Sequence, residues 1–562
     1  MASVQEALYV FPPPPDADAV EWPGEPIGRS NVVTRTKTRT AIHDKTIDDT
    51  AGRREHLVNA AIAHLVQYGG RESTYLHDVV IHGIRVRAIT NSDHLIQFWR
   101  ENWYSPEEWQ VVTGSSPPAD PQVVVYALGH VQDEAEAAYY SRATSTIIFF
   151  NTSYFGQLKS WVLGAVGRVL AAEFGIHSLH GACVERDGEG VLYIAPTGTG
   201  KSTSSYGLMT YPGTRFHSDD WVYVRYARFT KRDQPVVPIE IVPDKGERIR
   251  GYRCNPWLTD NPTAAGVALC LDLANRAVSV ELSELDHARP IQAYAYTSEK
   301  VFYLRSNLVE NFPDTADAIL RANLENVPSA TPGFLAENRQ TIESIIADLR
   351  TSPNADIRRG LGALPDERLR PLVGALFAFD NARSMLDIAS VFPASRVFTN
   401  PLEPVRLSTV FLLKRDPTDP VVLKLLTLER FMERLLIGET PDGKREIAYN
   451  AYRAVNDEAE NSAVAALERE SAKQVIPLYQ AFLGASELPE SLREEFTLFG
   501  ELYRSARCYD CNTTLQRDPA VTSKKEAVQL TLEVILRGIA NRSPDLTLTL
   551  ENYRAQLPTD SR

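Results

Sequence analysis

The segment 190–205, GVLYIAPTGTGKSTSS, constrains the fold of this chain more than any other. VLYIA is an apolar run typical of a buried strand. It leads into a glycine-rich loop and a helix-compatible stretch that hold eight candidate phosphate contacts: Pro196, Thr197, Gly198, Thr199, Gly200, Lys201, Ser202 and Thr203. A strand, a glycine-rich loop, Gly-Lys-Ser and a helix in this order predict a phosphate-binding loop.

The chemistry of such a loop explains its residue types. Glycines let successive backbone N–H groups point inward at an anion, and the following helix directs its positive end at the same phosphates. We expect Lys201 to reach the β and γ phosphates and the Ser202 hydroxyl to ligate Mg²⁺. The first motif position is Ala195 instead of glycine, and alanine is small enough for it. The expected cofactors are therefore ATP and Mg²⁺.

An acidic pair follows the loop closely. RFHSDDWVYV places Asp219 and Asp220 18 and 19 residues after Lys201, between two strand-like runs. Two carboxylates beside Mg·ATP can divide the work, one serving the metal and the other accepting a proton from the attacking hydroxyl. The alternative is a solvated Asp-Asp turn.

A histidine precedes the loop. HGACVER and GVLYIA are joined by Asp187-Gly188, a pattern that predicts a hairpin leading into the loop. His180 would begin that hairpin near the mouth of the loop, where a histidine can tune a carboxylate. His177 competes for the role, and a structural histidine is the other reading.

Two further sequence features are candidates for a chemical role. Arg305 ends the apolar run VFYLR and is a candidate catalytic cation near the migrating phosphoryl group, with a surface salt bridge as the alternative. Cys508 and Cys511 form a single CxxC, whereas zinc needs about four ligands. No histidine follows His287, so we expect no zinc there.

Together, His180-Gly181, the loop ending at Ser202, and Ser218-Asp219-Asp220 resemble the catalytic core of HPr kinase/phosphorylase. They also resemble the ATP-dependent phosphoenolpyruvate carboxykinases, which share that nucleotide-binding architecture. The resemblance covers about 177–225, with a weaker match at 404–437. It implies a mixed, β-rich P-loop fold with Lys201 and Ser202 on Mg·ATP. It also implies Asp219 as base, Asp220 serving the metal and His180 assisting the base.

This chain also departs from both families. HPr kinases carry a glutamate soon after the loop serine, whereas here the serine is followed by Thr203-Ser204-Ser205-Tyr206. The sequence also shows no clear copy of the short motif with which HPr kinases dock HPr. The carboxykinase pattern needs a His and Lys metal pair and a substrate arginine upstream, which were not located in residues 60–150. The leading hypothesis is thus an ATP-dependent kinase acting on a hydroxyl of a protein, peptide or small molecule. A carboxykinase-like lyase and a catalytically silent nucleotide-binding scaffold are the alternatives.

Composition limits the partners. Lys+Arg is 59 against Asp+Glu 72, giving a formal charge of −13, which disfavours a nucleic-acid or anionic-membrane binder. No apolar run approaches the roughly 20 residues that span a bilayer. The N-terminus lacks the features of a secretory signal, and five cysteines are too few for a disulfide scaffold, so we expect a cytoplasmic protein.

The expected class is α/β (α+β) with a mixed sheet. We expect a Pro-rich arm at 1–55, a small α/β module at 56–150, a kinase-like core at 151–440 and a helical region at 441–562. A helical insertion is predicted at about 313–390. Alternation predicts one strand over 79–90, and the helical tail would supply packing or a face for homo-oligomer formation.

Overall fold

In the computed structural model, the described residues form two large sheets, two small ones and the helices that pack on them. The described residues are 33–34, 43–46, 52–67, 74–132, 134, 137–151, 155–195, 199–228, 239–240, 253–254, 291–305, 336, 339–351, 358, 361–377, 383–387, 394–436 and 458–557. Most of the Pro-rich arm and part of the helical insertion lie outside these ranges.

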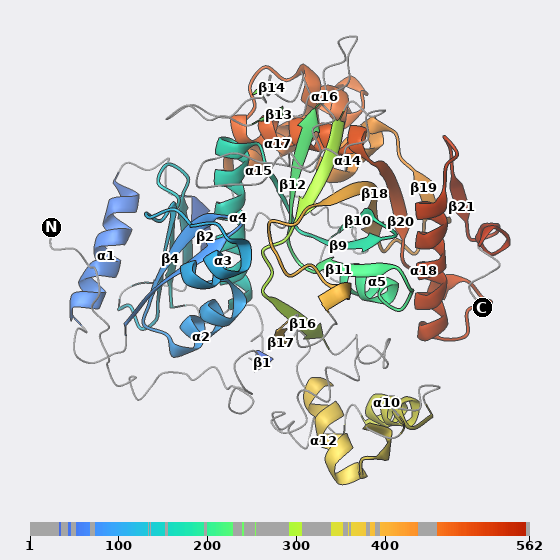
Figure 1. Ribbon diagram of the computed structural model, residues 1–562. Helices are drawn as coiled ribbons and strands as arrows, with labels where there is room; N and C mark the ends of the chain where they lie inside the picture. Colours follow the sequence, from blue (N-terminus) through green and yellow to red (C-terminus); the bar gives the residue numbers. More distant parts are fainter. Residues whose placement is uncertain are drawn as a thin grey trace.

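A six-stranded mixed sheet with order β2-β6-β7-β5-β4-β3, together with α1, α2 and α3, forms what we call the N-terminal module (Figure 1). Its elements are β2 (His43–Thr46), α1 (Arg53–Gln67), β3 (Tyr75–Ile81), β4 (Ile84–Thr90), α2 (Asp93–Asn102), α3 (Pro106–Thr113), β5 (Val123–Leu128), β6 (Ala137–Ser141) and β7 (Thr146–Phe150). Helix α1 packs Leu57 and Ala61 on one face. The aromatic side chains of α2 pack on the other.

Residues 79–90 are not the single strand that alternation predicts. They form most of a hairpin, in which β3 and β4 are joined by His82 and Gly83. Both turn residues have positive φ, 47° and 80°, as the two-residue turns that match strand twist require. The apolar residues alternate on both sides of the turn, so the sequence pattern hides it.

The central sheet has ten strands, in the order β11-β9-β10-β18-β15-β12-β8, with β20 beside β18 and β19 between β20 and β21. They are β8 (His177–Leu179), β9 (Gly181–Arg186), β10 (Glu189–Ile194), β11 (Thr214–Ser218), β12 (Val222–Arg228), β15 (Ile291–Tyr296), β18 (Val405–Lys414), β19 (Val421–Leu425), β20 (Arg507–Asn512) and β21 (Thr547–Thr549). β18 runs parallel to β10 and β20 and pairs antiparallel with β15. The mixed α/β class is confirmed.

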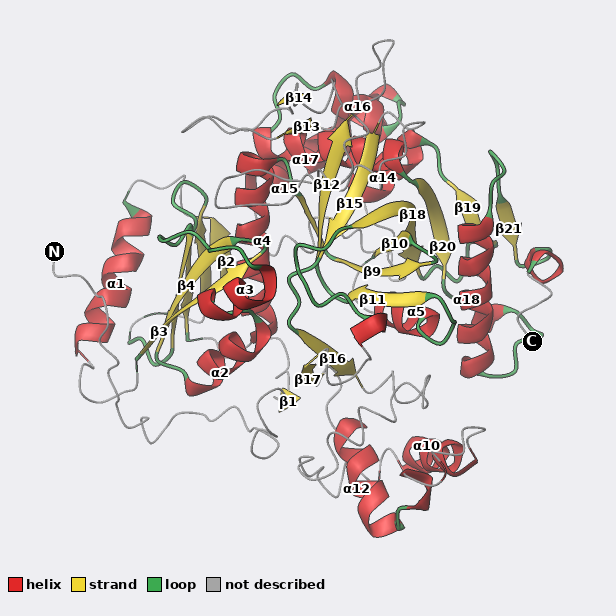
Figure 2. Cartoon of the chain, viewed as in Figure 1, coloured by secondary structure: helices red, strands yellow, loops and turns green. Residues whose placement is uncertain are grey.

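Helices cover both faces of the central sheet (Figure 2). They are α4 (Phe155–Phe174), α5 (Lys201–Leu208), α14 (Leu428–Leu436), α15 (Glu458–Gln474), α16 (Leu478–Gly484), α17 (Glu490–Ser505) and α18 (Lys524–Ala540). α5 and α18 share one hydrophobic cluster with β10 and β18, and α14 to α17 share another with β12 and β15. The central sheet is therefore the middle layer of the molecule.

Short elements complete the described chain. A three-stranded sheet contains β1 (Val33–Thr34), β16 (Val301–Arg305) and β17 (Arg383–Asp387), and a two-stranded one contains β13 (Ile239–Glu240) and β14 (Arg253–Cys254). Within the predicted insertion lie α10 (Arg339–Thr351) and α12 (Asp366–Phe377). Among the described residues, no helix has the length and apolar character needed to cross a membrane.

The C-terminal part is helix-rich, but it is not only helical as the sequence pattern suggested. β19, β20 and β21 come from it, and β20 is an inner strand paired with β18 on one side and β19 on the other. Strands buried on both faces lose the polar alternation that marks a strand in sequence. The four-part division of the chain stays a prediction.

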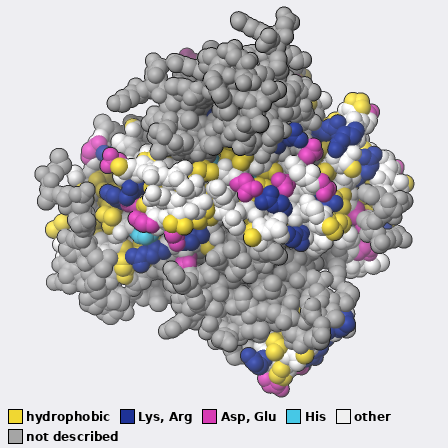
Figure 3. Space-filling model, in the orientation of Figure 1, with side chains coloured by type: hydrophobic (Ala, Val, Ile, Leu, Met, Phe, Trp, Pro, Cys, Tyr) yellow, Lys and Arg dark blue, Asp and Glu magenta, His cyan; other side chains and the backbone are white. Residues whose placement is uncertain are grey.

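Helix α4 joins the N-terminal module to the central sheet. Trp161 belongs to a hydrophobic cluster that includes Phe149 of the module and Tyr223 and Tyr294 of the central sheet. Figure 1 shows α4 between the two sheets. On the face drawn in Figure 3, basic and acidic side chains of the described residues are interspersed.

Candidate functional site

The strand and the helix predicted on either side of the phosphate loop are both present in the described residues. β10 ends at Ile194 and α5 begins at Lys201. Gly200 precedes the helix with φ +105°, a left-handed conformation that favours glycine. Thr513, which follows β20, donates its hydroxyl to the Thr199 carbonyl at 2.9 Å and so ties the loop to the end of β20, the strand on the far side of β18 from β10. Pro196, Thr197 and Gly198 lie outside the described residues.

Lys201 lies across the loop and reaches His180. Its Nζ donates to the Ala195 carbonyl at 2.9 Å and lies 2.9 and 3.1 Å from Nδ1 and Nε2 of the His180 ring. The side chain is almost wholly buried, at 8% exposed. An ammonium can only donate, so Lys201 donates to the ring nitrogen that carries no proton in the tautomer present.

Asp220 receives two donors, one at each carboxylate oxygen. Its Oδ1 lies 3.2 Å from His180 Nε2, and its Oδ2 accepts from Lys159 Nζ on α4 at 2.7 Å. With Nδ1 accepting from Lys201, Nε2–H is the atom that donates to Asp220. Lys201, His180, Asp220 and Lys159 thus form one continuous polar chain.

Asp219 differs sharply from its neighbour. It is 1% exposed, and neither carboxylate oxygen has a hydrogen-bond partner among the described residues. A buried carboxylate without donors is costly unless a ligand, cation or water completes it. Of the two acids, Asp219 is the one with oxygens available to a bound group.

Glu299, in the turn after β15, holds the backbone of the acidic pair. Its carboxylate accepts the N–H groups of Asp219 and Asp220 at 2.8 Å each, and that of Trp221 at 3.3 Å. Burial raises the pKa of Glu299 to about 7, aided by the negative charges of Asp219 and Asp220 and opposed by Lys159.

Lys159 and Glu299 were missed by sequence reasoning. Lys159 had a detectable signal, because it is the one charged residue in the mostly apolar segment 155–167, FGQLKSWVLGAVG. A lone lysine on an apolar helix needs a partner. Glu299 stands in a polar turn, TSEK, where a glutamate is unremarkable.

The other predicted residues divide into three groups. Ser202 and Thr203 lie in the first turn of α5, as the motif requires. Arg305 ends β16, in the three-stranded sheet, and its side chain is outside the described set. His177 is a packing histidine: its ring contacts Phe499 at 4.1 Å and the Tyr226 hydroxyl at 3.3 Å, so geometry favours His180 over it.

The donor set suits Mg²⁺. The Ser202 hydroxyl and the Asp219 and Asp220 carboxylates offer oxygen, which Mg²⁺ prefers, and the orphaned Asp219 oxygens are the observation that supports the fit. The described part of the chain contains no group of three or more His, Cys, Asp or Glu side chains arranged to hold a metal alone. Mg²⁺ usually takes only one or two carboxylates and completes its shell with substrate phosphates and water.

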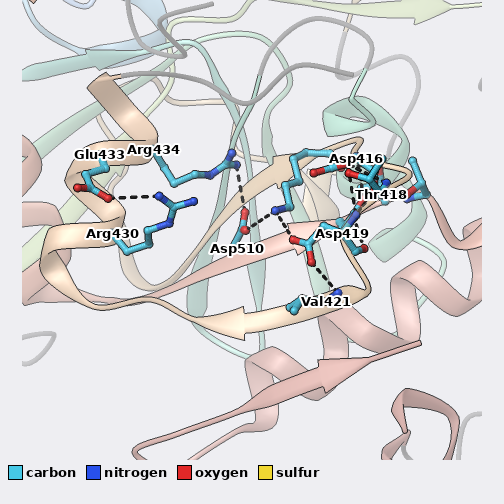
Figure 4. Close-up of polar contacts among 12 residues, drawn as sticks. Asp416, Thr418, Asp419, Val421, Arg430, Glu433, Arg434 and Asp510 are labelled. Carbon is cyan, nitrogen blue, oxygen red and sulfur yellow. Dashed lines mark hydrogen bonds and ion pairs between the residues drawn. The ribbon is translucent and has the colours of Figure 1, made fainter. Parts of the chain in front are cut away.

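A second polar cluster lies near the carboxyl ends of the parallel strands β18 and β20 (Figure 4). Lys414 pairs with Asp419 at 2.6 Å and with Asp510 at 3.0 Å, and Arg434 contacts Asp510 at 3.1 Å. Burial would raise the pKa of Asp419, but the hydrogen bond from Lys414 holds it below its usual value. These contacts fix the β18–β19 connection and are structural.

The two cysteines of the CxxC motif cannot act together. Both are buried on β20, but Cys508 packs in the cluster on one face of the central sheet and Cys511 in the cluster on the other. Residues three apart on a strand point to opposite faces. A shared metal or a disulfide between them is therefore excluded by the strand geometry.

Comparison with known proteins finds a partial likeness. No protein-family profile matches this chain. A stretch of 131 aligned residues is 28% identical to the protein named phosphoenolpyruvate carboxykinase (ATP) 1 of Urochloa panicoides, and covers 22% of this chain. The match spans about a fifth of that relative, 20% of its length.

Proposed function

We propose that this protein is an ATP-dependent phosphotransferase that moves the γ-phosphate of Mg·ATP to a hydroxyl of a protein, peptide or small molecule. The observation that carries the proposal is Asp219, a buried carboxylate with no hydrogen-bond donor in the part of the chain that the structure describes, one residue from the polar chain that links Asp220 through His180 to Lys201. The similarity to an enzyme named for ATP supports the choice of nucleotide.

Each residue has a role in this reaction. The N–H groups at the start of α5 and the Lys201 ammonium bind the phosphates, and Lys201 stabilises negative charge on the migrating group. Asp219 accepts the proton of the attacking hydroxyl as base. His180 helps to hold the acid pair in place through Asp220. A bound Mg²⁺, held by Ser202 and, directly or through water, by the acidic pair, would neutralise charge on the phosphate oxygens.

A carboxykinase-like lyase is the second candidate, and one observation favours it. That pattern needs a Lys and a His together, and Lys159 and His180 both contact Asp220, the first of them just beyond the region 60–150. The relative from Urochloa panicoides carries the corresponding name. The third alternative, a nucleotide-binding scaffold without turnover, has less support. Such a scaffold would not need Lys201, Ser202 and an Asp219 without a donor among the described residues together.

The test is phosphoryl transfer from γ-labelled ATP and Mg²⁺ by the purified full chain. Acceptors are presented as a desalted protein extract, as the small-molecule fraction of that extract, and as a panel of keto acids with CO₂ release recorded. The proposal expects label on an acid-stable hydroxyl phosphoester. ADP formation that requires a keto acid and is matched by CO₂ supports the lyase, and ATP binding without turnover supports the scaffold.

Two variants separate enzyme from contaminant. Asp219→Asn should abolish labelling while retaining ATP binding. The matched control is Asp187→Asn, which makes the same chemical change at an exposed hairpin turn. Asparagine tolerates the left-handed φ of 51° at this position. Labelling that persists unchanged with Asp219→Asn would reject Asp219 as the base.

A further inference from the structure

We propose that Glu299 is a positioning residue that fixes the orientation of the acidic pair and is itself held in place by the N-terminal module. The role in catalysis rests on the proposed function, but the positioning can be measured without it. Glu299 touches only backbone groups of the pair, so it acts through Asp219 and Asp220 and not on a substrate.

The first step is the three-point contact. Oε2 accepts from Asp219 N, and Oε1 accepts from both Asp220 N and Trp221 N. Three successive N–H groups that converge on one carboxylate define the path of the β11–β12 connection, and with it the direction of both acidic side chains. Without the carboxylate, these N–H groups would lose their acceptor, and a buried N–H group without an acceptor is destabilising.

The second step is the support of Glu299 by the N-terminal module. The backbone N–H of His82, at the tip of the β3–β4 hairpin, donates to the Ser298 hydroxyl at 2.6 Å. Tyr104 donates its hydroxyl to the Glu299 carbonyl at 3.5 Å, and Lys300 Nζ lies 2.8 Å from Glu108 of α3. Contacts from the module therefore reach three consecutive residues of the turn, 298–300.

The third step is aromatic packing that fixes the hairpin tip. The His82 ring stacks on Tyr223 of β12 at 4.6 Å with an interplanar angle of 8°. β12 is the strand that follows Asp219 and Asp220. The hairpin tip thus contacts the strand after the acidic pair and the turn that holds the pair's backbone, so a displacement of the module would disturb both.

The test uses Glu299→Gln in the full chain. The amide offers one acceptor oxygen, but its NH₂ group faces backbone N–H donors, so the turn loses part of its support. Hydrogen–deuterium exchange should accelerate at least 10-fold in a peptide covering 219–221. Turnover should fall by about 10²-fold, the effect expected when a reacting group is misplaced by about 1 Å. The Kd of a fluorescent ATP analogue should not change. The matched control, Glu367→Gln at an exposed position of α12, should change neither the exchange rate nor the turnover.

Lys300→Met tests the module's part. It removes the contact with Glu108 while leaving Glu299 intact, and it should accelerate exchange at 219–221 in the same direction by a smaller factor. Wild-type exchange at 219–221 in Glu299→Gln would overturn the proposal. Fast exchange in that variant, combined with a wild-type chain that transfers no phosphate, would instead overturn the proposed function and leave the positioning intact.

Discussion

Lys159 of α4 and Asp220 of the β11–β12 connection form a buried ion pair, with Nζ 2.7 Å from Oδ2 and side chains only 6% and 10% exposed. The pair connects a helix that packs on the N-terminal module to the acidic turn of the central sheet. It also explains the different states of the two acids, since Asp220 is charge-balanced and Asp219 has no donor among the described residues.

Removing one partner of this pair should be worse than removing both. Lys159→Met leaves the buried Asp220 without its lysine partner, and breaking a buried pair in this way costs about 3–5 kcal/mol. The double variant Lys159→Met/Asp220→Asn should recover part of that loss. Thermal unfolding of both singles and the double gives the coupling, and strictly additive effects would show that the pair contributes nothing.

Lys201→Ala should remove phosphoryl transfer and weaken ATP binding. The backbone N–H groups of the loop and α5 remain, so some affinity should survive while the rate falls by about 10²–10³-fold, as for loss of one electrostatic stabiliser. Steady-state kinetics and nucleotide titration check this, with Lys473→Ala on the exposed end of α15 as control. Unchanged turnover in Lys201→Ala would place the active site elsewhere.

The two acids should fail differently when converted to asparagine. Asp219→Asn keeps shape and ATP affinity but cannot accept a proton, so the chemical step should drop roughly 10²–10⁴-fold. Asp220→Asn should raise the Mg²⁺ requirement and weaken Mg·ATP binding, because a carboxylate facing the cation is lost. A Mg²⁺ titration of transfer by each variant measures the difference.

Excess Mg²⁺ should partly restore Asp220→Asn and leave Asp219→Asn unchanged. A reversed rescue pattern would exchange the two roles. Wild-type behaviour of both variants would reduce the pair to a structural turn and remove the main support for the kinase proposal.

Cys508 and Cys511 should be dispensable for catalysis. Cys508→Ala/Cys511→Ala removes two buried thiols from opposite faces of β20, so stability should fall while kcat and KM stay near the wild-type values. Kinetics at a temperature well below the unfolding midpoint separates the two effects. Stoichiometric zinc in the native protein, lost in this variant, would contradict the prediction.

His82 should make the fold sensitive to acid. Burial lowers the pKa of His82 to about 3, whereas the unfolded chain takes up this proton near pH 6.5. Protonation therefore favours unfolding: the contribution to stability is complete above about pH 6.5 and is lost as pH falls towards 3, at ~1.4 kcal/mol per pH unit. Burial lowers the pKa of His217 in the same way, also to about 3.

His82→Asn checks the contribution of this one site, because asparagine tolerates the left-handed φ of 47° without titrating. The thermal midpoint of the variant should be lower at pH 7.5 but should fall less steeply between pH 6.5 and 5. An unchanged pH slope would mean that His82 does not titrate in this range.

Local structure near the phosphate loop could be predicted because each signal there is local. The β9–β10 hairpin with its Asp187-Gly188 turn, the strand before the loop, and helix α5 follow from turn residues, apolar runs and glycines a few positions apart. The N-cap Ser92 of α2, which accepts from Leu95 N, and the end of α4 before Gly175 were predictable for the same reason. The His82-Gly83 turn and β20 were not, since neither interrupts the apolar pattern around it.

The sequence by itself determined the phosphate-loop motif, the mixed α/β class and three members of the polar chain, Lys201, His180 and Asp220. Only the tertiary structure could add Lys159 and Glu299, 61 residues before and 79 after Asp220, because long-range packing brings them together. It also distinguished Asp219 from Asp220, which look alike in sequence. The availability of a carboxylate depends on which donors surround it, and the donors to Asp220 come from α4 and from the residue between β8 and β9, while the turn after β15 supplies the acceptor for the backbone of the pair.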